Sequence, residues 1–182
     1  MFKIALTAGH YKYTPGKRCL KSLDPSETRE WVLNDRIADK IEKLLKNYDG
    51  YSLLRTDDTT GEKDVSLQAR TDAANKFKAD FYLSIHHNAG VSTEIYDEKA
   101  GKTTIKPGTG GGIVAYVYTK VDAETKAWQK ELYDALIAKT GLKGNRANPL
   151  NSADLHELRE TEARAVLLEL GSKVRTEPQI SG

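Results

Sequence analysis

Short apolar runs alternate with amphipathic stretches along this chain, and the alternation constrains the fold more than any other feature of the sequence. Apolar runs bounded by glycine and polar residues are typical of buried strands. The strands predicted in this way cover residues 2–8, 51–55, 81–85, 113–118 and 163–170. Apolar side chains recur at helical spacing in between, over residues 25–45, 66–77 and 122–140. The pattern predicts a single-domain α/β fold, with a twisted, mixed and mainly parallel sheet flanked by helices on both faces.

The boundaries of the predicted helices follow from capping residues. Residues 24–27 (DPSE) indicate a helix start with Asp24 as the N-cap and proline at the first helical position. Asp64 or Ser66 can cap the second helix, and Gly141 ends the third. Residues 90–112 are polar and rich in glycine, so we expect a loop or a small hairpin there, at the rim of a functional site.

Length and composition indicate one globular domain. A chain of 182 residues with 38% hydrophobic and 30% charged residues can bury a core of ordinary size. The net charge is only +2 and no basic block occurs, so we expect no nucleic-acid partner. One cysteine, Cys19, excludes an intrachain disulfide and a cysteine-based zinc site. We expect residues 1–173 to form the domain and the polar residues 174–182 to begin a linker or C-terminal tail.

The chain contains no segment that approaches the roughly 20 apolar residues of a transmembrane helix. The apolar run at the N-terminus is too short for a signal peptide. We therefore expect a protein that is synthesised in the cytoplasm without a signal peptide.

Side chains that bind metals or transfer protons stand at the ends of three predicted strands. His10 follows the first, His86 follows the third, and Glu169 lies near the end of the last. The carboxyl ends of strands in open α/β sheets are where sites form, and Glu30 lies on the helix that returns from the first strand. Two histidines and one glutamate, with a fourth position left for water, are the ligands of a hydrolytic zinc site. A carboxylate in an apolar strand, such as Glu169, suits an acid/base role because desolvation raises its pKa.

Each of these residues also has a simpler interpretation. His10 could be a loop histidine, and Glu30 could be one solvated charge among many on a helix. His87 follows His86, and because adjacent strand residues point to opposite sides, at most one of the two faces the site easily. Residues 156–160 (HELRE) resemble half of a zinc-protease motif without its second histidine, and we interpret them as a polar-faced segment.

The ordered motifs add a family resemblance. The sequence resembles the zinc-dependent N-acetylmuramoyl-L-alanine amidases (type 3 amidases) of bacterial autolysins and phage endolysins. The matching segments are residues 8–10 (AGH), 30–34 (EWVLN), 70–88 (RTDAANKFKADFYLSIHHN), 158–159 (LR) and 165–171 (AVLLELG). The chain departs from the family at Thr7-Ala8, where Asp-Pro is frequent, and at Ser172-Lys173. Neither departure removes a ligand or the carboxylate, but both could alter the preference for the stem peptide.

The resemblance implies a Zn²⁺ ion on His10, Glu30 and His86, with Glu169 as the catalytic residue. It implies cleavage of the peptidoglycan amide between N-acetylmuramic acid and the L-alanine of the stem peptide, which lyses the bacterial cell wall. It does not identify substrate-binding residues. An endolysin fits better than an autolysin. We expect the protein to be made in the bacterial cytoplasm and to act on the cell wall after release or export. We also expect a possible C-terminal wall-binding domain outside this chain. A zinc peptidase that cuts within the stem peptide and a non-catalytic wall-binding module remain as alternatives.

Overall fold

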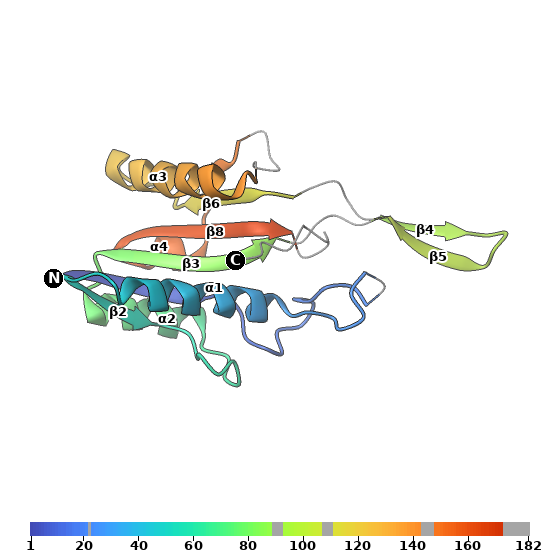
Figure 1. The fold of residues 1–182 in the computed structure, drawn as a ribbon, viewed down its shortest axis with the longest axis horizontal. Coiled ribbons are helices and arrows are strands. Elements are labelled where there is room, and N and C mark those ends of the chain that lie inside the picture. The colour runs from blue at the N-terminus through green and yellow to red at the C-terminus, as the bar shows by residue number, and fades with distance from the viewer. Residues whose placement is uncertain (22, 89–92, 107–110, 143–147, 173–182) are drawn as a thin grey trace.

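One six-stranded sheet organises the chain, in the strand order β2-β1-β3-β8-β6-β7 (Figure 1). The structure is a computed structural model, and it describes residues 1–21, 23–88, 93–106, 111–142 and 148–172. Its strands are β1 (Phe2–Ala8), β2 (Tyr51–Arg55), β3 (Phe81–Asn88), β6 (Ile113–Val117), β7 (Leu150–Ser152) and β8 (Arg164–Ser172). Neighbouring strands are parallel except β8 and β6, which are antiparallel. The predicted mixed, mainly parallel sheet is therefore confirmed.

Helices cover both faces of this sheet, as the sequence predicts. The two long helices α1 (Glu30–Leu45) and α3 (Ala123–Thr140) pack on one face, over one set of alternate strand residues. The helix α2 (Leu67–Phe77) and the four-residue helix α4 (His156–Arg159) pack on the other face, over the other set (Figure 1). The core is thus two apolar layers separated by the sheet.

The predicted Ser66 cap of α2 and the predicted end of α3 at Gly141 are confirmed, but α1 begins later than predicted. The side chains of Ser66 and Asp122 accept hydrogen bonds from the first turns of α2 and α3. The predicted helix start at Asp24 is wrong, because α1 begins only at Glu30. The Asp24 carboxylate instead accepts the backbone N–H groups of Ser26 and Thr28 and closes a turn. Glu27 has a φ of 50°, a left-handed conformation that interrupts helical continuation.

The predicted loop or hairpin at residues 90–112 contains an antiparallel hairpin of β4 (Thr93–Asp97) and β5 (Lys102–Lys106). The hairpin projects away from the body, on the side to which the carboxyl ends of β3 and β8 point (Figure 1). The predicted linker or tail at residues 174–182 lies outside the described residues. Within the described ranges, no helix is both long and apolar enough to cross a membrane.

Candidate metal centre

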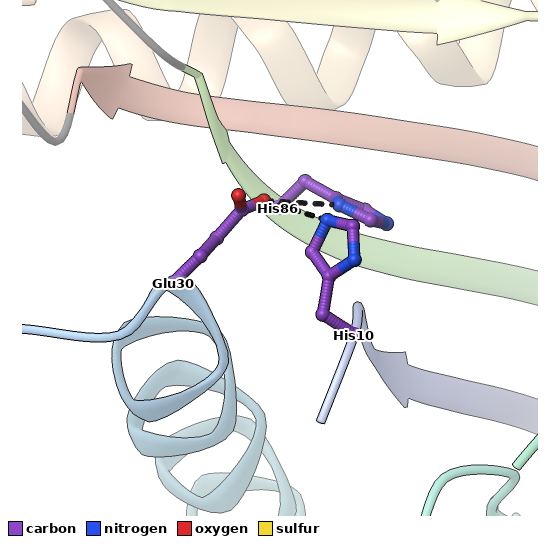
Figure 2. A group of neighbouring side chains, drawn as sticks. All are labelled: His10, Glu30 and His86. Carbon is purple, nitrogen blue, oxygen red and sulfur yellow. Dashed lines mark hydrogen bonds and ion pairs between the residues drawn. The ribbon is translucent and has the colours of Figure 1, made fainter. Parts of the chain in front are cut away.

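The structure brings His10, Glu30 and His86 together at the carboxyl end of the sheet (Figure 2). His10 follows β1, His86 lies near the end of β3, and Glu30 is the first residue of α1. One donor atom from each residue lies within 4.8 Å of the other two. The Glu30 Oε1 atom is 3.2 Å from both His10 Nε2 and His86 Nδ1. Their role as metal ligands stays a prediction, but the side chains converge as that role requires.

The donor set fits a zinc ion. The Glu30 side chain is 1% exposed, and a buried carboxylate is costly unless cations or donors surround it. The buried His10 Nε2 atom lies 3.2 Å from Glu30 Oε1 but makes no hydrogen bond within the part of the chain that the structure describes. The same Glu30 oxygen lies 3.2 Å from His10 Nε2 and forms a 3.2 Å hydrogen bond with His86 Nδ1, so one carboxylate oxygen faces two imidazole nitrogens, an arrangement that suits a shared cation. Imidazole nitrogen and carboxylate oxygen are the ligands that hydrolytic zinc sites use.

Gly9 allows the His86 ring to reach the end of β1. A Cβ atom at Gly9 would lie 2.1 Å from Cε1 and 2.3 Å from Nε2 of His86. Only glycine therefore leaves room for the ring. The Gly9 N–H donates to the Ile85 carbonyl at 2.9 Å, which ties the two strand ends together. His10 then adopts a φ of 67°. Residues other than glycine rarely adopt this left-handed conformation, and those that do cluster at functional sites.

Asn34 explains the spacing of residues 30–34. It lies one helical turn after Glu30 and is fully buried. Its Nδ2 donates to the Gly9 carbonyl at 3.0 Å, and its Oδ1 lies 2.8 Å from His87 Nδ1. The Asn34 NH₂ group donates to Gly9, and its Oδ1 atom can only accept a hydrogen bond. His87 Nδ1 is therefore the donor in the second bond. His87 therefore braces α1, whereas His86 faces Glu30 and His10.

Arg70 fixes the backbone around His10 from the opposite face. Its guanidinium is buried and donates to the Ala8 and His10 carbonyls at 2.7 and 2.9 Å. It also donates to Thr7 Oγ1 and to the Val65 carbonyl. The planar fork of arginine suits these separated acceptors, so Arg70 links α2 to the end of β1.

Glu169 lies beside His86 across the β3–β8 ladder. The two residues are register partners, so their side chains leave the same face of the sheet. Glu169 is half-buried, and its negative charge is one of the causes that raise the pKa of His86. The structure therefore places it next to the three converging donors, while its catalytic role stays a prediction.

Burial and nearby carboxylates shift the two imidazoles in opposite directions. Burial lowers the pKa of His10, and the Glu30 carboxylate offsets this only in part. Burial also lowers the pKa of His86, but Glu157 and Glu30 outweigh it and raise the pKa to about 9. The surroundings of His86 are therefore strongly negative, as a cation-binding site requires.

Glu157 is a residue of this region that the sequence interpretation missed. The segment 156–160 is not uniformly polar-faced, because Glu157 and Leu158 are buried. The Glu157 Oε2 atom lies 3.8 Å from His86 Nε2. A four-residue helix is too short to show periodicity, so no pattern in the sequence separates Glu157 from exposed glutamates nearby.

Two proteins from Bacillus align with nearly the whole chain. The "Sporulation-specific N-acetylmuramoyl-L-alanine amidase" of Bacillus subtilis (strain 168) is 31% identical over 172 residues, which is 94% of this chain and 56% of that protein. The "N-acetylmuramoyl-L-alanine amidase CwlM" of Bacillus licheniformis is 31% identical over 171 residues, with the same two coverages. The chain therefore spans about half the length of the curated relatives that it matches.

The fold also resembles a solved amidase domain. The catalytic domain of CwlV, an N-acetylmuramoyl-L-alanine amidase from Bacillus (Paenibacillus) polymyxa var. colistinus, superposes with a TM-score of 0.74. The match covers 96% of this chain and 83% of that one at 23% identity, so it supports the fold alone. The family model described as N-acetylmuramoyl-L-alanine amidase matches residues 4–177, which is nearly the full chain. The chain belongs to the N-acetylmuramoyl-L-alanine amidase family.

Proposed function

We propose that this protein is a zinc-dependent peptidoglycan hydrolase that cleaves the amide between the lactyl group of N-acetylmuramic acid and the L-alanine of the stem peptide. The observation that carries the proposal is the convergence of His10, Glu30 and His86 at the carboxyl end of the sheet. Family membership indicates which bond is cleaved. The converging donors indicate how the chain could hold a metal ion that helps to cleave it.

His10, Glu30 and His86 would hold the zinc ion. When bound, zinc supplies a Lewis acid that activates water near neutral pH and polarises a carbonyl oxygen. The chain contributes the rigidity of the site. Gly9, Asn34 and Arg70 fix the backbone from which His10 projects, and the β3–β8 ladder fixes His86.

Glu169 would carry the proton. Its half-buried carboxylate projects from the same face as His86, next to the three donors. It would accept the proton of the attacking water and return it to the leaving nitrogen of L-alanine. An amide needs this second step because an amine anion is a poor leaving group.

Digestion of purified cell walls tests the bond. Mass spectrometry of the products should show stem peptides with a free L-alanine amino terminus and glycan strands without peptide. A chelator should stop the release, and added zinc should restore it. A cut inside the stem peptide would instead indicate a zinc peptidase. A chain that binds walls without metal and releases nothing would be a binding module.

The Glu169→Gln variant tests the proton carrier. It should keep one zinc ion per chain, whereas its rate of wall hydrolysis should fall about 10²–10⁴-fold, the usual contribution of a general acid/base. Glu131→Gln is a matched control, because Glu131 is exposed on α3. Near-normal activity in Glu169→Gln would reject the role.

A further inference from the structure

Glu157 is a buried carboxylate that the proposed reaction does not use. It lies on α4, on the face of the sheet opposite α1, and is 5% exposed. Its Oε1 atom accepts a hydrogen bond of 2.6 Å from the Tyr82 hydroxyl. Its Oε2 atom accepts a longer one, 3.3 Å, from the Ser84 hydroxyl and also faces His86 Nε2 at 3.8 Å. Burial of a charge at this cost needs a reason.

The His86 ring lies between two carboxylates. Its Nδ1 atom is 3.2 Å from Glu30 Oε1, and its Nε2 atom, on the other side of the ring, faces Glu157. The Nε2 atom is buried and makes no hydrogen bond within the described residues. The separation from Glu157 exceeds a hydrogen bond but is within ion-pair range. Nδ1 is therefore the nitrogen that points to the proposed zinc position.

Glu157 is arranged to stay ionised. Tyr82 and Ser84 are hydroxyl donors, and an ionised carboxylate only accepts hydrogen bonds. An acceptor opposite Nε2 favours a ring that carries its proton on that nitrogen.

A neutral imidazole has one N–H and one lone pair, so the position of the proton decides which nitrogen can bind a metal. Histidine ligands of metals generally donate their second N–H to a carboxylate or carbonyl, which fixes the ring and raises its basicity. We infer that Glu157 is a positioning residue, which holds the His86 proton on Nε2 and so keeps Nδ1 available for zinc. This inference rests on the zinc site of the proposed function.

Zinc affinity separates this role from a merely structural one. The Glu157→Gln variant keeps the shape of the side chain but removes its charge. Its dissociation constant for zinc, measured by competition with a chromophoric chelator, should rise about 10–100-fold. The Thr161→Val variant is the matched control, because it removes a buried hydrogen bond to the Glu157 backbone carbonyl but leaves the Glu157 carboxylate and its partners in place. It should lower the melting temperature of the metal-free chain and leave zinc affinity unchanged.

Equal zinc affinity in wild type and Glu157→Gln would overturn the inference, and so would equal losses in Glu157→Gln and Thr161→Val. A second measurement needs no variant. Nitrogen-15 NMR of the zinc-loaded wild-type chain should show the His86 proton on Nε2, and a proton on Nδ1 would overturn the inference. Zinc binding without release of L-alanine amino termini would refute the proposed reaction and not this role. A wild-type chain that binds no zinc would refute both.

Discussion

Replacement of Gly9 by alanine tests how tightly the metal centre is built. The new Cβ atom would lie 2.1, 2.3 and 2.5 Å from three atoms of the His86 ring, whereas ordinary contacts begin at 3.4 Å. Gly9 does not have a positive φ, so alanine brings no backbone strain and the substitution acts only through this clash. The ring must therefore move by more than about 1 Å.

The size of this movement decides the expected result. Overpacking of this kind costs about 1–3 kcal/mol of stability, which a folded chain tolerates. Zinc ligands, in contrast, tolerate deviations of only about 0.2 Å. The Gly9→Ala chain should therefore fold, melt at a lower temperature, and bind zinc at least ~10-fold more weakly. Urea unfolding and chelator competition measure the two effects separately.

A double-mutant cycle identifies the clash as the cause. In a His86→Ala background the ring is absent, so Gly9→Ala should cost little or no stability. An equal cost in both backgrounds, or unchanged zinc affinity in Gly9→Ala alone, would refute the reasoning.

Three other predictions follow from the same region and from α3. His86→Ala should lose zinc and His87→Ala should retain it, because only His86 faces Glu30 and His10, so metal content by elemental analysis decides between them. Arg70→Lys should lower the free energy of unfolding by about 2–4 kcal/mol in urea titrations, because one ammonium cannot replace a fork with four acceptors; a change within error would contradict this. Hydrogen bonds from Thr125 lower the pKa of Asp122 in the folded chain, so the stabilisation by its charge is present above the unfolded pKa and is lost as pH falls through the folded pKa. The melting temperature of wild type should therefore exceed that of Asp122→Asn more at pH 7 than near pH 3, and a constant difference would refute the linkage.

The long elements of the fold could be predicted because each leaves a local pattern. The strand of residues 163–170 is mostly apolar, with an unbroken apolar run at residues 165–168, and β8 pairs on both sides in the middle of the sheet. The start of α1 could not be predicted. The Asp24 carboxylate accepts hydrogen bonds from backbone N–H groups two and four residues later and closes a turn, and an aspartate that caps a helix accepts hydrogen bonds of the same kind. β7 and α4, with three and four residues, are too short for any period.

The candidate site likewise contains residues that the sequence predicts and residues that it does not. The positions of His10, His86 and Glu169 at strand ends indicate that they converge, and the structure brings His10 and His86 together with Glu30. The period of two permits only one of the paired histidines at the site, but choosing His86 needed the family resemblance. Glu157 could not be found, because its burial depends on Tyr82 and Ser84, which lie 75 and 73 residues away in sequence.

Three carboxylates lie near His86, and their environments favour Glu169 as the proton carrier that we propose. Glu30 would use its lone pairs on the metal. Glu157 accepts bonds from Tyr82 and Ser84 and has a lowered pKa, so it is a weak base. The remaining carboxylate, Glu169, is therefore the proposed proton carrier. A saturating zinc concentration should distinguish its role from that of Glu157. Under that condition Glu157→Gln should recover most of its wall hydrolysis, because its defect is in metal binding, whereas Glu169→Gln should stay inactive at every zinc concentration. Recovery of Glu169→Gln by zinc would assign the proton transfer to another group.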